Sequence, residues 1–143
     1  MKTKLVPTLR TTLLADSAVC LLSGALLVAW PLPLATHFAT AELLVAGAPL
    51  GVFLRWLGAA VLLIGAGVYA VARQRRIAPR AVFPILVIEV LWLAGCAWLG
   101  ATYYPHLTAA GVAFLLAAAV IVLLFLVLET LGLQHHAPTD NPA

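Results

Sequence analysis

Residues Leu107–Leu131 read LTAAGVAFLLAAAVIVLLFLVLETL, an apolar run in which Glu129 is the only charged residue. A helix needs about 20 predominantly apolar residues to cross the hydrocarbon core of a bilayer, and this run is longer. Gly132 follows at once, in a position where glycine favours the end of a helix. The run therefore predicts a membrane-spanning helix.

Three more runs have the same character, at Thr11–Trp30, Leu50–Ala72 and Ala81–Ala101. Hydrophobic residues make up 64% of the 143-residue chain and charged residues 9%, whereas soluble domains average about 25% charged residues. The expected fold is all-α, a polytopic membrane protein with a four-transmembrane-helix bundle over residues 1–134. A disordered polar tail is expected at 135–143. The first run is too long for the apolar region of a signal peptide, so we expect it to be retained.

The basic residues predict the orientation of the bundle. Arg55 apart, they lie in two clusters, at residues 2–10 and in the link 73–80. Because Lys and Arg favour the cytoplasmic side, we expect both termini and this link in the cytoplasm, and the protein in the bacterial cytoplasmic (inner) membrane. The same orientation puts four aromatic residues at the outer interface: Trp30, Trp98, Tyr103 and Tyr104. A net charge of +3 arranged in this way does not indicate nucleic-acid binding.

Two further patterns concern packing. Gly51, Gly58 and Gly65 recur every seven residues on one helical face, which lets two helix backbones approach closely, within the bundle or between copies in a homo-oligomer. In the outer link Pro31–Pro49, the stretch Thr40–Ala46 is interpreted either as a short helix on the membrane surface or as an ordinary loop.

Three carboxylates fall at membrane depth, Asp16, Glu89 and Glu129. Placing a charge there costs roughly 2.5–3.5 kcal/mol on insertion scales, so such a residue normally faces a partner or a water-filled cavity. All three belong to the predicted inner half of the bilayer and form a candidate proton or cation site. The alternative is structural, because arginines border the same side. Asp16 can pair with Arg10 or bond to polar neighbours such as Ser17, and Glu129 is shallow enough to reach water. Glu89 is the deepest and favours a functional or interhelical role.

Arg55 is the one basic residue on the predicted outer side. Glu42 in the outer link is its expected ion-pair partner, and such a pair would fix the link against the second span. The alternative is that Arg55 attracts an anionic lipid headgroup or substrate.

Metal and cofactor binding are not expected. His37 and His106 lie in the two outer links, without a third ligand, and no histidine lies within a span to bind haem. Cys20 and Cys96 lie inside apolar runs and are interpreted as small packing residues.

The chain resembles small uncharacterised bacterial four-helix integral membrane proteins. The resemblance rests on Leu9-Arg10, Leu14-Ala15-Asp16, Leu128-Glu129 and Gly132-Leu133, and it implies a fold rather than an activity. Small multidrug resistance exporters also carry an acidic residue in the first of four spans. Their sequence context and short outer links are absent here, so only the physical analogy remains.

Three classes of function are compatible with these patterns. The first is a non-enzymatic membrane component or partner subunit, with the lipid bilayer and a homo-oligomer or membrane protein as its partners. The alternative is a small proton- or cation-coupled carrier that uses the carboxylates. An enzyme acting on lipids or quinones ranks last, because no catalytic motif is present and the spans contain few polar residues. Carboxylates paired with arginine would argue against the carrier, and carboxylates lining a cavity would favour it.

Overall fold

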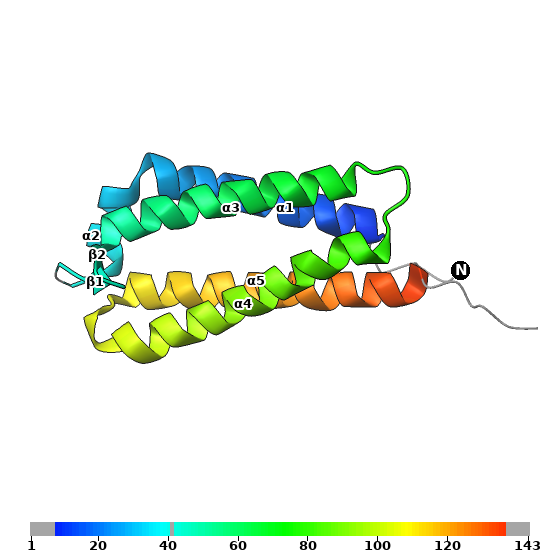
Figure 1. Cartoon of the computed structure of the whole chain (residues 1–143). Coiled ribbons are helices and arrows are strands. Elements are labelled where there is room, and N and C mark those ends of the chain that lie inside the picture. The colour runs from blue at the N-terminus through cyan, green and yellow to red at the C-terminus, as the bar shows by residue number, and fades with distance from the viewer. Residues whose placement is uncertain (1–7, 41, 137–143) are drawn as a thin grey trace, which may run out of the picture.

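The computed structural model describes residues 8–40 and 42–136, in which four long helices form an antiparallel bundle (Figure 1). All four are long and apolar enough to cross a membrane, which confirms the all-α prediction and the four apolar spans. The elements in chain order are α1 (Leu9–Ala29), α2 (Pro31–Phe38), β1 (Leu44–Val45), β2 (Ala48–Pro49), α3 (Leu50–Ala72), α4 (Pro79–Tyr103), η1 (Tyr104–His106) and α5 (Ala109–His136).

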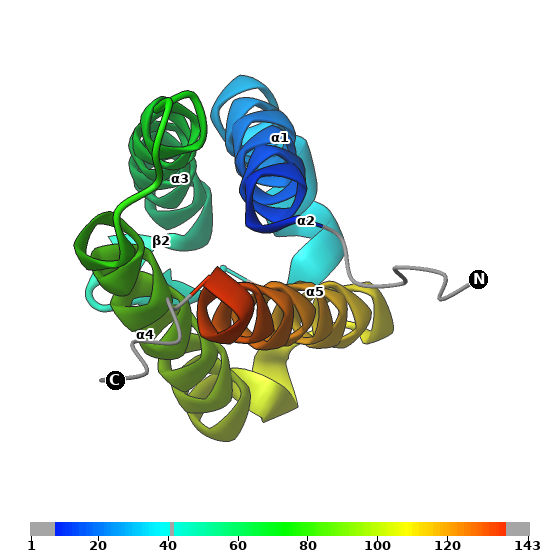
Figure 2. The same cartoon turned by 90° about the vertical axis from the view of Figure 1, so that its right-hand side faces the viewer.

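The helices follow the order α1, α3, α4, α5 around the bundle when it is viewed end-on (Figure 2). The most extensive contact joins α1 to α3, and α4 packs mainly on α5. By contrast, α3 and α4 touch little, although they are consecutive in the chain. They diverge from the link 73–78 towards the opposite end of the bundle (Figure 1).

Prolines and short polar side chains fix the helix boundaries. The Thr8 hydroxyl accepts a hydrogen bond from the Thr11 amide at 3.4 Å and caps the start of α1. Pro31 and Pro79 occupy first-turn positions of α2 and α4, where a missing N–H costs nothing. At the start of α5, the Thr108 hydroxyl accepts from the Gly111 amide at 3.1 Å.

Glycines bring α1 and α3 into close contact. A Cβ atom on Gly58 would lie 2.7 Å from the Leu27 Cβ and 2.9 Å from the Gly24 carbonyl oxygen. A Cβ on Gly65 would lie 2.9 Å from the Cys20 Cβ. The glycine face of α3 therefore packs inside the bundle, which is the first of the two alternatives for this pattern.

The outer link differs from both expectations for Thr40–Ala46. Its helix is α2, which lies earlier in the link, and residues 44–49 form a two-stranded antiparallel hairpin that pairs Leu44 with Pro49. Ala46 and Gly47 make the turn with φ of 51° and 81°, the positive values that a tight hairpin turn requires. We call this end of the bundle the hairpin end.

The other end, which we call the arginine end, contains the start of α1, the link 73–78 and the end of α5. Arg10 donates hydrogen bonds to the carbonyl oxygens of Gln74, at 2.6 Å, and Arg75, at 3.3 Å, so its cation lies at the carbonyl end of α3. Gly132 does not end α5, which continues to His136 and so includes the first two residues of the predicted tail. Its backbone lies against Leu9. The rest of that tail lies outside the described residues.

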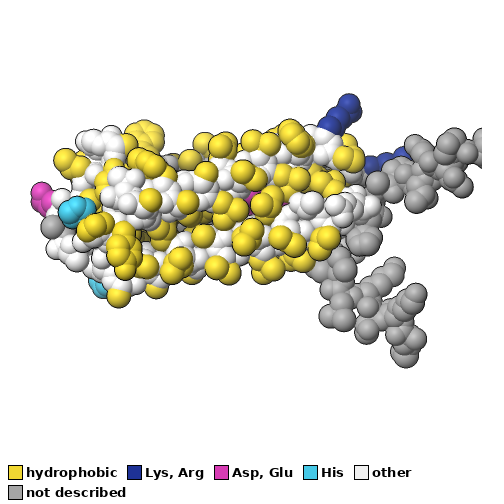
Figure 3. Space-filling view, turned by 90° about the horizontal axis from the view of Figure 1, so that it is seen from below, with side chains coloured by type: hydrophobic (Ala, Val, Ile, Leu, Met, Phe, Trp, Pro, Cys, Tyr) yellow, Lys and Arg dark blue, Asp and Glu magenta, His cyan; other side chains and the backbone are white. Residues whose placement is uncertain are grey.

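An apolar core closes the bundle near the arginine end. Its members are contributed by α1, α3 and α4, and all are at least nine-tenths buried: Leu9, Leu13, Val68, Ala72, Val82 and Ile85. The bundle's flank is mostly apolar, with basic side chains at one end and acidic and histidine side chains at the other (Figure 3).

Candidate functional site

The three intramembrane carboxylates converge inside the bundle. Asp16 comes from α1, Glu89 from α4 and Glu129 from α5, and one oxygen atom from each lies within 4.8 Å of the other two. Their side chains are 5%, 6% and 0% exposed. The sequence places them at overlapping depths, but their meeting depends on the order of the helices around the bundle. We call this group the carboxylate cluster.

Helical periodicity explains why these charges face inwards. Asp16 lies on the same face of α1 as the buried residues Leu9 and Leu13. Glu89 lies on the same face of α4 as the other buried residues of that helix, which are Val82, Ile85 and Cys96. The carboxylates therefore occupy positions where the helix pattern otherwise places core residues.

Most oxygen atoms of the cluster have no hydrogen-bond partner among the described residues. Both side-chain oxygens of Glu89 and of Glu129 are buried and unpartnered. Asp16 accepts one weak bond, from the Cys20 thiol at 3.6 Å. A buried polar group normally has a partner, so these oxygen atoms are free to take up protons or to bind a cation.

Arginine does not supply that charge. Arg10, a possible partner of Asp16 in the structural alternative, is exposed and donates to the backbone of the α3–α4 link instead. Within residues 8–40 and 42–136, no ion pair reaches the cluster. Glu129 does not reach water, because it is fully buried. The described residues thus show neither the arginine pairing nor the contact of Glu129 with water on which the structural alternative rests.

A cavity of about 310 Å³ borders the cluster, and we call it the carboxylate cavity. Asp16 and Glu89 line it together with Cys20 and Ser23, and the rest of its wall is almost entirely apolar. Acidic side-chain atoms are visible in the middle of the apolar flank in the space-filling view (Figure 3). The cluster is therefore not sealed on all sides, although apolar core closes the bundle near the arginine end.

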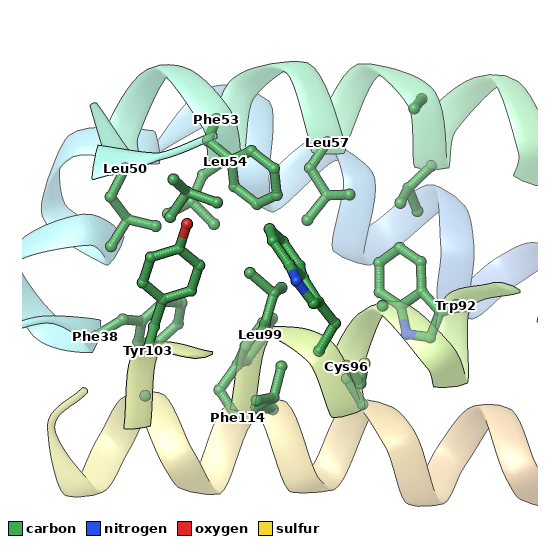
Figure 4. Close-up of a pocket in the computed structure, with 18 of the residues that line it drawn as sticks. Phe38, Leu50, Phe53, Leu54, Leu57, Trp92, Cys96, Leu99, Tyr103 and Phe114 are labelled. Carbon is green, nitrogen blue, oxygen red and sulfur yellow. The ribbon is translucent and has the colours of Figure 1, made fainter. Parts of the chain in front are cut away.

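A second cavity of about 400 Å³ lies between α3 and α4, towards the hairpin end. Figure 4 shows Phe53 and Leu57 entering it from α3, and Trp92 and Tyr103 from α4. We call it the aromatic cavity, since six aromatic residues line it: Phe38, Phe53, Trp92, Trp98, Tyr103 and Phe114.

The oxygen spacing of the cluster suits a single cation. Calcium-to-oxygen distances are 2.3–2.6 Å, so two ligands on opposite sides of one ion lie about 5 Å apart. The 4.8 Å limit within the cluster is compatible with such an ion. Protons shared between the carboxylates would also reduce the charge. The site is therefore suited to exchange between protons and a cation.

The sequence analysis assigned no role at the site to three residues that lie beside the cluster. Cys20 contacts Asp16 one helical turn away, a spacing of four residues that is visible in the sequence. Trp92 follows Glu89 by three residues, and its buried Nε1 has no partner among the described residues. Ser23 lines the cavity, and its hydroxyl donates to the Val19 carbonyl oxygen at 2.7 Å.

The other candidate residues do not form a second site. Arg55 and Glu42 are both exposed, and among the described residues no ion pair joins them, so the structure does not contain the pair expected from the sequence. The His37 ring is hydrogen-bonded through Nδ1 to the Pro33 carbonyl oxygen at 2.8 Å. In the part of the chain that the structure describes, His37 and His106 belong to no group of three possible metal ligands.

No family model matches the chain, and no curated protein or solved structure is significantly similar to it.

Proposed function

We propose that this protein is a small membrane carrier in which Asp16, Glu89 and Glu129 bind a cation in exchange for protons. The observation that carries the proposal is the convergence of three buried carboxylates, two of them without any hydrogen-bond partner among the described residues. Further support comes from the cavity beside them. Its proposed location is the bacterial cytoplasmic membrane, with both termini in the cytoplasm.

Repulsion between the three carboxylates supports the proposal that protons or a cation must be present at the cluster. Two unit charges 4.8 Å apart repel by on the order of 3 kcal/mol at an effective dielectric constant of about 20. The cluster contains three such pairs when every carboxylate is ionised. Since no basic side chain among the described residues is paired with the cluster, protons or a cation must reduce its charge, and the two compete for the same oxygen atoms.

The packing also supports a site that opens to one side at a time. The apolar core around Leu13 and Val82 separates the cluster from the arginine end, while the cavity approaches it from within the bundle. Pro84 lies in α4 between the core residues Val82 and Ile85, on the arginine-end side of Glu89, where it removes one backbone hydrogen bond. A bend at Pro84 would move Glu89 relative to the other two carboxylates and change the access to the cluster.

The test is proton release on cation addition, measured on purified protein in weakly buffered detergent solution with a pH indicator. Sodium, potassium, magnesium, calcium and manganese are added in turn at mildly alkaline pH. We expect at least one of them to release protons saturably from the wild type, and Glu89→Gln to abolish this release. Glu42→Gln is the matched control, because Glu42 is exposed at the hairpin end.

Two results would count against the proposal. One is the absence of proton release and of saturable binding with every cation. The other is an unchanged response of Glu89→Gln, which would assign the protons to another group.

The second candidate function is a membrane partner subunit, and α5 favours it. Of the four spans, α5 is the least buried within the bundle. Its outward face is formed by large apolar side chains: Leu116, Val120, Leu123, Leu124 and Val127. Lipid or another membrane protein would cover this face. Crosslinking of the protein in its native membrane distinguishes the two, since a partner subunit gives a defined complex.

A further inference from the structure

The two cavities adjoin one another. They share seven lining residues, of which the largest are Trp92 and Phe114. Their volumes of about 310 and 400 Å³ each lie within the range of small-molecule sites, about 300–1,000 Å³. Together they extend from the carboxylate cluster towards the hairpin end, with the shared side chains at their boundary.

The combined lining of the two cavities is chemically asymmetric. Acidic groups border one end, where Asp16 and Glu89 line the carboxylate cavity. Aromatic and aliphatic side chains from α3, α4 and α5 form almost all of the remainder (Figure 4). Calcium and magnesium are held by oxygen ligands alone, so a bare metal ion at the carboxylates makes no use of an apolar space of this size. A ligand with a cationic head and an apolar body uses both parts.

Trp92 lies where the two parts meet. It follows Glu89 by one helical turn and lines both cavities. The face of an indole ring attracts organic cations, most strongly when the cation is removed from water. Phe114 on α5 also lines both cavities. A cationic head beside the cluster would therefore have carboxylates and aromatic rings within the same space.

The hairpin closes the far end of the aromatic cavity. Tyr103, which lines that cavity, accepts a hydrogen bond from the Ala46 amide through its hydroxyl, at 3.4 Å. Val45 is buried and belongs to the same wall. The apolar body of a ligand would thus be enclosed between α3, α4 and the hairpin.

We propose that the two adjoining cavities bind one amphiphilic organic cation, with an alkylated or protonated amine, or a similar onium group, beside Asp16, Glu89 and Glu129. Its apolar body lies between α3 and α4 in the aromatic cavity. This inference rests on the proposed exchange function and names its substrate class. Binding of the cation displaces the protons that otherwise reduce the charge of the cluster.

The test uses tetraphenylphosphonium as the probe and tetraphenylborate, which has nearly the same shape and the opposite charge, as its control. Binding to purified protein is measured by equilibrium dialysis at mildly alkaline pH, and proton release is recorded in parallel. We expect saturable binding of tetraphenylphosphonium with proton release. Tetraphenylborate should bind at least tenfold more weakly, and Glu89→Gln should weaken tetraphenylphosphonium binding at least tenfold.

A second variant tests the apolar cavity separately from the carboxylates. Gly95 lines the aromatic cavity, and a Cβ atom there would meet no atom within 4 Å, so Gly95→Leu fills space without a backbone clash. It should weaken tetraphenylphosphonium binding at least tenfold and leave proton release by inorganic cations unchanged. Gly67→Leu is the matched control, since Gly67 is equally open but lines neither cavity.

The outcomes separate this inference from the proposed function. Proton release by an inorganic cation without tetraphenylphosphonium binding would overturn the organic-cation assignment and leave the exchange site intact. Equal binding of the two tetraphenyl ions, or full binding by Gly95→Leu, would show nonspecific partition and overturn it as well. If no cation, organic or inorganic, releases protons, both proposals fail together.

Discussion

Glu129 is the most deeply buried of the three acids, with no exposed surface and no hydrogen-bond partner for either oxygen among the described residues. The free energy that its burial costs the folded protein depends on whether protons or a cation occupy the cluster. When the cluster is charged and no cation is bound, Glu129 repels Asp16 and Glu89 at short range. A neutral amide of the same shape removes that repulsion and can donate a hydrogen bond to either neighbour.

We therefore expect Glu129→Gln to raise the free energy of unfolding by about 1–3 kcal/mol in a chelator at mildly alkaline pH. The gain should shrink as the pH falls, because protons then neutralise the cluster in the wild type. Thermal unfolding in detergent measures both effects, with Glu42→Gln as an exposed control that changes neither. A lower melting temperature for Glu129→Gln would indicate that this carboxylate is held by a bound ion even in the chelator.

At the scale of single elements, the contact between α1 and α3 depends on glycine. A methyl group on Gly58 would be pressed against the Leu27 Cβ at 2.7 Å and the Gly24 backbone at 2.9 Å, and neither neighbour is a flexible side-chain end. We expect Gly58→Ala to destabilise the protein by about 1–3 kcal/mol, the usual cost of overpacking. Gly67→Ala, where a Cβ meets nothing within 4 Å, should be neutral or slightly stabilising in the same unfolding assay. Equal stability of the two variants would contradict this packing.

The long helices were predictable because each of them contains a long apolar run in the sequence. Leu50–Ala72 agrees with its predicted bounds, and the span predicted as Ala81–Ala101 is extended by two residues at each end. The outer link was not predictable in the same way. The link is short, and its apolar residues are equally compatible with a helix, a strand or an interfacial loop. What decides its structure is tertiary contact, such as the hydrogen bond from the Thr40 amide to the His106 carbonyl oxygen at 3.0 Å.

At the scale of the whole molecule, the residues of the candidate site were predictable from the sequence, but their arrangement was not. The sequence identified Asp16, Glu89 and Glu129 because charge in an apolar run is conspicuous. Their convergence depends on how α1, α4 and α5 are arranged around the bundle, and the periodicity of a single helix does not encode that arrangement. The pair of Arg10 and Asp16, one of the alternatives left open by the sequence, is not formed for a related reason. Spacing along α1 allowed it, but the carbonyl oxygen of Gln74 in the α3–α4 link provided a competing acceptor.

The orientation of the molecule decides which side of the membrane supplies the site. If both termini lie in the cytoplasm, as we propose, the apolar core near the arginine end faces the cytoplasm, and the cavities approach the cluster from the outer half. Single cysteines placed in a variant without Cys20 and Cys96 test this in intact cells. We expect Glu42→Cys in the outer link to react with a membrane-impermeant maleimide, and Arg75→Cys to react only after the membrane is permeabilised. Both residues are exposed, so a difference in labelling reports sidedness rather than burial. The reverse pattern would place the arginine end outside and reverse the direction from which cations reach the carboxylates.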